Sequence, residues 1–324
     1  MDDPVVILEQ VRGCLDNWAV TVHDITLVSQ SENIVYRVTT NAETRYAFRI
    51  HRLGYHTFEE LVSEHEWTNA LTRAGFSLPN AIPTTSGGFY VPVEVNGGTL
   101  YAGLIEWIDG KSLYAMMQEN PSTAFLGSSL EKLGQLMAKL HEHSRQWQPG
   151  KTFVRHKFDV DGFFGESPFW GRYWESPYVD KNQRALLLTS QHTLVETLNT
   201  LGYASNVFGM IHADLHHDNL LLTGNEMHII DFDDAGFGWY LYDIAVALFE
   251  YQSRTDFEEI SSALFRGYEK VTTLTTEQRA LITMFIHIRA RAIIGWATAR
   301  PELDNAEGIK KLVHRTCEDA LAYR

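Results

Sequence analysis

Asp214, Asn219 and Asp231 could do chemistry together because an apolar-turn-apolar pattern links them. Asp214 and Asn219 precede a run of three leucines, and Asp231 follows a second apolar run that begins after a turn at residues 223–225. This pattern predicts a β-hairpin. With a turn of two or three residues, Asn219 lies opposite Ile230 or Asp231, with facing Cα atoms roughly 5 Å apart.

The predicted hairpin brings an amide oxygen and a carboxylate to one end. Oxygen ligands of this kind suit Mg²⁺, so Asn219 and Asp231 are the predicted metal ligands. Asp233 is a third candidate for the metal, with capping or solvent exposure as the alternative explanation. Asp214 lies five residues before Asn219 in the connecting loop, where its carboxylate could reach a hydroxyl group near the metal.

His212, Asp214 and Asn219 also fit the H-x-D-x-x-x-x-N template of kinase catalytic loops, position by position. Kinases place the Asp of a second metal motif shortly after the hairpin, where this chain has Asp231. Together these residues predict Mg²⁺-dependent phosphoryl transfer from ATP, with Asp214 as the catalytic residue. His212 is then expected to be a core histidine that hydrogen-bonds to the backbone.

Two further features near this loop have alternative explanations. Asp243 begins an apolar helix, where kinases place an Asp that supports the catalytic loop, although an ordinary helix N-terminal charge would also stand there. His216 and His217 raise the possibility of zinc, but the sequence offers no clear second set of ligands for a zinc enzyme.

A kinase also needs a cation on a strand to hold the phosphates of ATP, and a carboxylate on the next helix to orient that cation. Arg49 stands where kinases have Lys, on the strand face opposite Phe48. Glu64 is its expected partner, with Glu60 as the second choice. Guanidinium binds phosphate well but is not interchangeable with an ammonium group, so whether Arg49 fully replaces Lys stays open.

The loop that covers the phosphates is expected at residues 29–33. It contains no glycine, so its backbone cannot approach phosphate as a glycine-rich loop does. The short polar side chains of Ser31 and Asn33 are the candidates to contact the nucleotide instead.

The elements around these residues predict an α+β, bilobal fold. Short alternating runs in the first hundred residues predict an antiparallel sheet with one helix at 57–74, and the pattern after Gly110 is mainly helical. We expect an N-terminal nucleotide-binding lobe at 1–105, a hinge at 106–112, and a C-terminal catalytic and acceptor-binding lobe at 113–324. The predicted strands are 25–30, 33–40, 45–51, 89–94 and 99–107, and the later helices lie near 130–141, 181–201, 241–252, 256–270 and 276–298.

The composition excludes several classes of protein. The 324 residues carry 27 basic and 41 acidic side chains, a formal net charge of −14, which opposes binding to nucleic acid. The sequence contains no stretch of about 18 uncharged apolar residues, so we expect no membrane span. The acidic N-terminus does not resemble a secretory signal. Cys14 and Cys317 define neither a disulfide framework nor a metal cluster, so we expect a cytoplasmic protein. The sequence does not define its oligomeric state.

On its motifs the sequence resembles the aminoglycoside phosphotransferase and choline kinase superfamily, whose members phosphorylate small molecules, over residues 28–300. It is similar to bacterial proteins related to stress-response kinase A and to homoserine-kinase-like phosphotransferases. The motifs that carry the resemblance are Ser31-Glu32-Asn33, Tyr36-Arg37-Val38, Phe48-Arg49-Ile50-His51-Arg52, Ser63-Glu64, Ile211-His212-Ala213-Asp214-Leu215-His216 with Asn219, and Ile230-Asp231-Phe232-Asp233-Asp234-Ala235.

The resemblance implies a protein-kinase-like fold that binds ATP in a cleft, with Glu106, Trp107 and Ile108 of the hinge as nucleotide contacts. It also implies Asp214 as catalytic base, and Asn219 and Asp231 as metal ligands. Ala213 departs from the family, which often has Gly at that position.

The sequence defines the identity of the phosphate acceptor less closely than it defines the residues of the predicted catalytic loop. A small alcohol such as an amino alcohol, a homoserine-like compound or an aminoglycoside is favoured, because no activation segment closing in Ala-Pro-Glu follows Asp231. A protein serine or threonine is the alternative, and a nucleotide-binding pseudokinase is disfavoured by the intact catalytic residues. The aromatic segment 163–174 serves either packing or the acceptor pocket. Arg289 and Arg291 either pair with acidic groups or contact an anionic acceptor.

Overall fold

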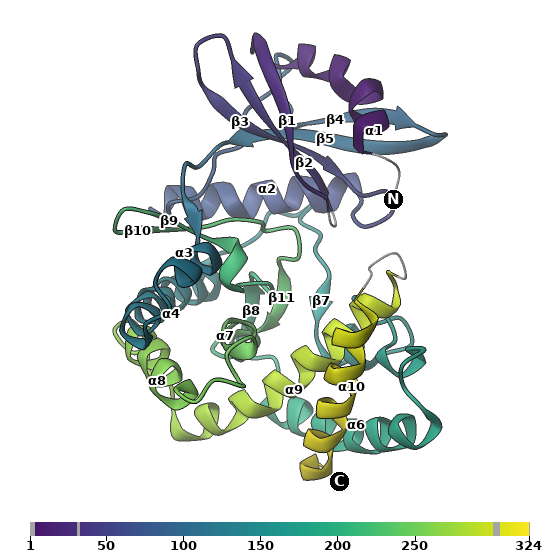
Figure 1. The fold of residues 1–324 in the computed structure, drawn as a ribbon, viewed down its shortest axis with the longest axis vertical. Helices are drawn as coiled ribbons and strands as arrows, with labels where there is room; N and C mark the ends of the chain where they lie inside the picture. Colours follow the sequence, from purple (N-terminus) through teal and green to yellow (C-terminus); the bar gives the residue numbers. More distant parts are fainter. Residues whose placement is uncertain (1–3, 31–32, 301–304, 324) are drawn as a thin grey trace. The chain divides into compact units, whose positions relative to one another are not determined.

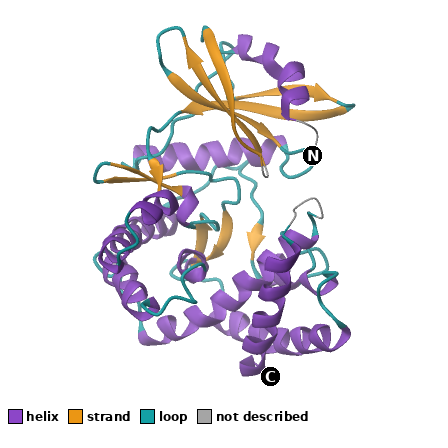
Figure 2. Ribbon diagram, viewed as in Figure 1, coloured by secondary structure: helices purple, strands orange, loops and turns teal. Residues whose placement is uncertain are grey.

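The computed structural model describes residues 4–30, 33–300 and 305–323 of the chain. The chain forms two compact units. The first comprises Met1–Gly110 and Pro149–Val154, and the second comprises Lys111–Gln148 and Arg155–Arg324. The first is built on an antiparallel sheet and the second is largely helical, which confirms the α+β class (Figures 1 and 2).

The first unit is a five-stranded sheet in the order β1-β2-β3-β5-β4, with every neighbouring pair antiparallel. α1 and α2 lie on opposite sides of this sheet (Figure 1). Its elements are α1 (Pro4–Val11), the 3₁₀ helix η1 (Arg12–Asn17), β1 (Val22–Gln30), β2 (Asn33–Thr40), β3 (Arg45–His51), α2 (Phe58–Arg73), β4 (Tyr90–Val95) and β5 (Gly98–Glu106).

Strand β3 separates the two sides of this sheet by simple alternation. Phe48 and Ile50 enter a core that also contains Val11 of α1 and Trp18, which follows η1, and Cys14 packs half-buried against it. Arg49 therefore points to the opposite side, where α2 lies.

Helix α2 begins as the sequence predicts. The Thr57 side chain accepts a hydrogen bond from the backbone of Glu60, and the Glu60 carboxylate accepts one from the backbone of Thr57. This reciprocal arrangement satisfies two backbone donors at the helix start.

The second unit contains eleven helices of α or 3₁₀ type among the described residues, and two small three-stranded sheets in the orders β10-β9-β6 and β7-β11-β8. Its elements are β6 (Lys111–Ser112), α3 (Leu113–Glu119), α4 (Thr123–Gln146), β7 (Lys157–Phe158), α5 (Val160–Phe164), η2 (Tyr173–Glu175), α6 (Lys181–Leu201), β8 (Phe208–Ile211), η3 (His217–Asn219), β9 (Leu220–Thr223), β10 (Glu226–Ile229), β11 (Gly236–Trp239), α7 (Tyr240–Phe249), α8 (Phe257–Tyr268), α9 (Thr276–Thr298), α10 (Ala306–Ala320) and η4 (Leu321–Tyr323).

Glycines allow α4 and α8 to approach each other closely. A Cβ atom added at Gly134 of α4 would collide with the backbone oxygen of Leu264, and one added at Gly267 of α8 would collide with that of Glu131. A larger residue at either position would force the two helices apart.

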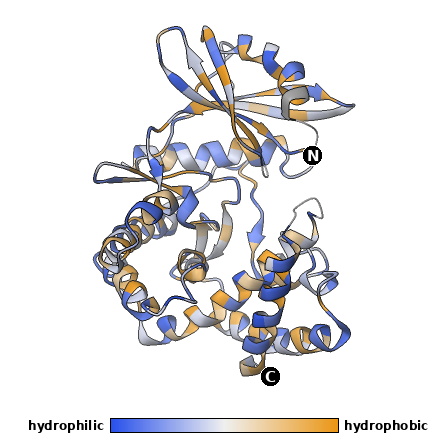
Figure 3. Ribbon diagram, in the orientation of Figure 1, coloured by the Kyte–Doolittle hydropathy of each residue, from blue (hydrophilic) through white to orange (hydrophobic). Residues whose placement is uncertain are grey.

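Among the described residues, one helix, α9, is long and apolar enough to be considered as a membrane span. More than half of its most apolar window, 56%, is buried inside the protein, as in the core helix of a soluble protein. The apolar composition of α9 is explained by its packing against α7 and α10. Along α10 itself, hydrophilic and hydrophobic residues alternate (Figure 3).

Several elements differ from the sequence prediction, including three that matter most for the fold. α1 and α10 were not predicted, and neither was β11, whose four residues include two glycines. The apolar run of α1 fits a strand as well as a helix, so periodicity cannot distinguish them over so few residues. Cys317 lies on α10 and is buried.

Candidate active site

The β9–β10 hairpin fixes the position of Asn219. Leu220 faces Ile229, and the backbone N–H of Ile230 donates to the carbonyl oxygen of Asn219 at 3.0 Å. Asn219 therefore lies opposite Ile230, the first of the two predicted registers, and Asp231 follows at the same end of the hairpin. The predicted hairpin is confirmed, with Gly224 and Asn225 between its strands.

Three side chains surround the carboxylate of Asp214. Its Oδ2 accepts from the Nδ2 of Asn219 at 3.0 Å and lies 3.2 Å from the Nε2 of His216. Its Oδ1 accepts from the Nη2 of Arg289 at 2.5 Å. Arg289 had no definite role in the sequence, and the structure pairs it with an acidic group.

These neighbours set the charge of Asp214. Burial by itself would raise the pKa of the Asp214 carboxyl, but the positive charges of His216 and Arg289 outweigh it and hold that pKa below its usual range. The same contact acts on His216, where the attraction of Asp214 outweighs burial and raises the imidazole pKa. Asp214 is therefore an ionised carboxylate at neutral pH.

Asp243 holds the backbone of the loop that carries Asp214. Its carboxylate is fully buried and accepts from the backbone N–H of His212 at 3.0 Å and from that of Ala213 at 2.7 Å. The Nε2 of His141 lies 3.1 Å from the same carboxylate. Ala213 has a φ of +66°, a left-handed conformation in which its N–H reaches Asp243.

His212 connects this loop to the hairpin. Its Nε2 hydrogen-bonds to the carbonyl oxygen of Ile230 at 3.0 Å, and its Nδ1 accepts from the backbone N–H of Asp214 at 3.3 Å. Burial lowers the pKa of His212, so the ring is neutral at physiological pH. Both ring nitrogens are occupied by backbone, as a core histidine requires and as a zinc ligand does not allow.

The acidic residues after the hairpin differ in exposure. Asp231 is exposed and has a φ of +63°, whereas the Asp233 side chain is buried. The backbone after Asp231 is held by Arg155, which donates to the carbonyl oxygens of Asp233 and Ala235.

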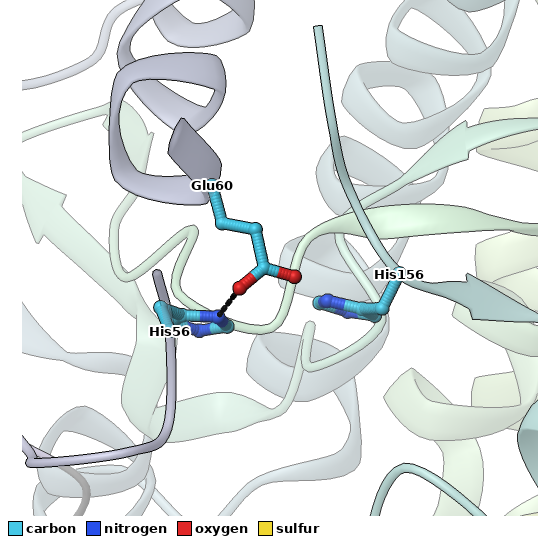
Figure 4. A group of neighbouring side chains, drawn as sticks. All are labelled: His56, Glu60 and His156. Carbon is cyan, nitrogen blue, oxygen red and sulfur yellow. Dashed lines mark ion pairs between the residues drawn. The ribbon is translucent and has the colours of Figure 1, made fainter. Parts of the chain in front are cut away.

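In the first unit, Arg49 lies next to Glu64 and both side chains are buried, with 3.6 Å between Nη1 and Oε1. Glu60, the second choice as partner, instead belongs to the start of α2. Its Oε2 lies 3.7 Å from the Nδ1 of His56 (Figure 4). The strand-and-helix placement predicted for Arg49 and Glu64 therefore brings them together.

The other predicted nucleotide contacts lie near the start of β2 and at the end of β5. Asn33 begins β2 and is buried, while Ser31 falls outside the residues that the structure describes. Glu106 ends β5, where its carboxylate accepts from the side chain of Asn80 at 2.7 Å. Trp107 donates from Nε1 to Asp109 at 3.1 Å, and Ile108 lies between these two residues.

Most of the aromatic segment 163–174 serves packing. Phe163, Phe164, Trp170 and Tyr173 are buried, and Trp170 stacks on Phe158 with 4.5 Å between ring centroids. Arg289 connects this cluster to Asp214, because its guanidinium lies 5.6 Å from the ring centroid of Trp170 and donates to the Asp214 carboxylate.

Arg291, two residues along the same helix, has a different environment. Its side chain is 1% exposed and donates to the Oγ of Ser190 at 2.8 Å and to the carbonyl oxygen of His287 at 3.2 Å. It is a structural residue that connects α9 to α6.

Comparisons with known proteins agree with this geometry. The model of the phosphotransferase enzyme family matches residues 24–281. Amicoumacin kinase of Bacillus subtilis (strain 168) is 22% identical over 282 residues, which cover 84% of this chain and 79% of that protein. A homoserine kinase of Methylobacillus flagellatus is 25% identical over 265 residues, which cover 78% of this chain and 72% of that protein.

Solved structures extend the likeness to the whole fold. A microcompartment-associated aminopropanol kinase is 27% identical, with a TM-score of 0.83 over 98% of this chain and 95% of that one. These findings confirm the family resemblance drawn from the motifs. The chain belongs to the phosphotransferase enzyme family and is a kinase.

Proposed function

We propose that the protein transfers the γ-phosphate of ATP to a hydroxyl group of a small amino alcohol or a related compound. The named relatives support a small-molecule acceptor, since they are kinases of aminopropanol, amicoumacin and homoserine. Among these three, the aminopropanol kinase combines 27% identity with coverage of nearly the whole chain. An amino alcohol is therefore the first acceptor class to test.

The observation that carries the proposal is the environment of Asp214. An ionised carboxylate is held by a braced loop beside Asn219, at the end of a hairpin that leads into Asp231. A carboxylate in this position can accept a hydrogen bond from an alcohol, and it orients the oxygen for attack on phosphorus.

The residues at the hairpin end fit a divalent cation. Within the described part of the chain, the hydrogen bonds of the Asn219 side chain are made by its nitrogen, Nδ2. The side-chain oxygen, Oδ1, is therefore available as a metal ligand. With Asp231 and Asp233 it forms a set of oxygen donors, the chemistry that Mg²⁺ prefers. When bound there, Mg²⁺ would neutralise the negative charge of the phosphates.

In the first unit, we assign the phosphate contact to Arg49. Glu64 fixes the guanidinium, which can bind phosphate oxygens through two parallel hydrogen bonds. We assign further nucleotide contacts to Asn33 and Ser31 near the start of β2, and to Glu106, Trp107 and Ile108 after β5.

The reaction is an in-line displacement. The acceptor oxygen forms a bond to the γ-phosphorus while the bond from that phosphorus to the bridging oxygen breaks, and ADP leaves with the electron pair. The hydroxyl proton passes to Asp214, and His212 and Asp243 keep the loop in position during this step.

The test is the release of ADP with Mg²⁺ and ATP against a panel of acceptors. The panel contains 1-amino-2-propanol, homoserine, choline, an aminoglycoside and casein. We expect a rate increase with a small molecule, and a loss of at least about 1,000-fold in kcat for Asp214→Asn with unchanged ATP affinity.

Two results would contradict the proposal. Phosphorylated casein without a response to any small molecule would indicate a protein kinase. Loss of ATP binding in a folded Asp214→Asn variant would make Asp214 part of the nucleotide site instead of the catalytic residue.

A further inference from the structure

Arg289 lies in the middle of α9, 75 residues from Asp214 in the sequence. Its side chain is 13% exposed, so the guanidinium is mostly removed from solvent. One side of the group lies over Trp170, and its Nη2 donates to the Oδ1 of Asp214 at 2.5 Å. A charge-assisted hydrogen bond of this length is among the stronger contacts a carboxylate makes.

The two oxygens of Asp214 are not equivalent. Oδ2 meets both the Nδ2 of Asn219 and the Nε2 of His216. Within the described residues, Oδ1 accepts a hydrogen bond from Arg289 alone. Each carboxylate oxygen can accept about two hydrogen bonds, so Oδ2 is full and Oδ1 has room for one more.

We propose that Arg289 is a positioning residue that orients Asp214 and directs the second lone pair of Oδ1 toward the acceptor hydroxyl. This inference rests on the proposed function and adds which oxygen receives the proton. Trp170 contributes by supporting the guanidinium on its ring face.

The step can be written with atoms and charges in balance. The acceptor O–H donates to Oδ1, the acceptor oxygen bonds to the γ-phosphorus, and the bond from phosphorus to the bridging oxygen of ADP breaks. The proton moves to Oδ1 and then to solvent. Arg289 keeps its own proton and its charge throughout, so it acts through Asp214 and not on the phosphate.

The geometry also explains why a guanidinium occupies this position. A flat group can lie on the indole of Trp170 while it donates to Asp214 from its edge, whereas an ammonium group has no flat face. Lys at this position would keep the charge and lose part of the orientation.

The experiment compares Arg289→Ala, Arg289→Lys and the control Arg279→Gln. Arg279 lies on the same helix but pairs at the surface with Glu269. We measure kcat and KM with the acceptor that the wild type uses, ATP affinity, and rescue of Arg289→Ala by free guanidinium ion. Circular dichroism and thermal unfolding show whether each variant is folded.

We expect kcat of Arg289→Ala to fall on the order of 100-fold, with ATP affinity unchanged and Arg279→Gln like the wild type. Free guanidinium ion should raise the kcat of Arg289→Ala about ten-fold. The ion is added at concentrations below those that unfold the protein. The double variant Asp214→Asn/Arg289→Ala should show no rescue. If Arg289→Ala does not fold, Arg289→Lys serves as the test, with an expected fall in kcat of about ten-fold and little change in KM.

Wild-type kcat in Arg289→Lys together with a folded Arg289→Ala that guanidinium does not rescue would overturn the inference. An Arg289 variant that raises only KM for the acceptor would also overturn it, since that result indicates direct binding of the acceptor. A wild-type protein that turns over no acceptor would contradict the proposed function itself, and the role of Arg289 with it.

Discussion

Ala213 shows, at the scale of one residue, how the loop that carries Asp214 is held in a conformation that most side chains avoid. Its φ of +66° costs about 1 kcal/mol for an L-residue. Two hydrogen bonds to the buried Asp243 carboxylate, from Ala213 and its neighbour His212, offset that cost. The family that the sequence resembles often has Gly at this position, and Gly adopts this conformation without strain.

Ala213→Gly should therefore stabilise the protein by about 0.5–1 kcal/mol, because it removes the strain. The control is Ala280→Gly, at an exposed position in α9, which should destabilise by about the same amount. Urea unfolding measures both values. Equal losses of stability in the two variants would contradict the assignment of strain to Ala213.

The roles of single residues were predictable to different degrees. The spacing of His212, Asp214 and Asn219 predicted the loop, because all three lie on one short segment. The contact between Asp214 and Arg289 was not predictable, since α9 is distant in sequence and no periodicity relates the two positions. Only packing of the helices brings that guanidinium to the carboxylate.

At the scale of elements, α9 and α10 pack around a buried histidine. His287 of α9 is 7% exposed, and its Nδ1 lies 3.4 Å from the Oδ2 of Asp319 on α10. Burial lowers the pKa of His287 to about 4, with Arg291 and Arg315 acting in the same direction and Asp319 opposing them. The ring is therefore neutral in the folded protein at neutral pH.

The burial of His287 makes stability depend on pH. The folded pKa lies below the unfolded value of about 6.5, so the contribution is present above pH 6.5 and is lost as the pH falls toward 4. Between pH 7.5 and 5.5 the free energy of unfolding should fall by about 1 kcal/mol through His287. Denaturant unfolding of His287→Gln should show a smaller fall, and His314→Gln, at an exposed site on α10, should match the wild type.

The elements were predictable where local signals are strong. The Thr57 cap predicted the start of α2, and the turn at Gly224 predicted the hairpin. α10 was missed although Ile309, Val313 and Cys317 recur at helical spacing, which is a signal that was available. β11 had no such signal, since Gly236 and Gly238 disfavour a strand and only its neighbours β7 and β8 stabilise it.

At the scale of the whole molecule, each unit contributes its own part of the proposed reaction. Arg49 and Glu64 belong to the first unit, and Asp214, Asn219 and Asp231 belong to the second. Binding of a nucleotide to the folded chain should therefore stabilise it against unfolding.

ATP at 100 times its dissociation constant should stabilise the folded state by about 2.7 kcal/mol, which raises the melting temperature by a few degrees. With Mg²⁺ the increase should be larger than with EDTA, and Asn219→Ala should remove this difference while Arg49→Ala removes the ATP effect itself. Differential scanning fluorimetry provides the measurement. An identical response of the wild type in EDTA and in Mg²⁺ would contradict the metal assignment.

The two cysteines give the protein a practical property. Burial raises the pKa of Cys14 to about 12 and also raises that of Cys317, so both thiols are poor nucleophiles at neutral pH. The natural chain therefore serves as its own background for labelling with maleimide dyes. New cysteines at the exposed positions Gln10 and Lys311, one in each unit, would react first. Each unit would then carry one dye at a known position on its surface.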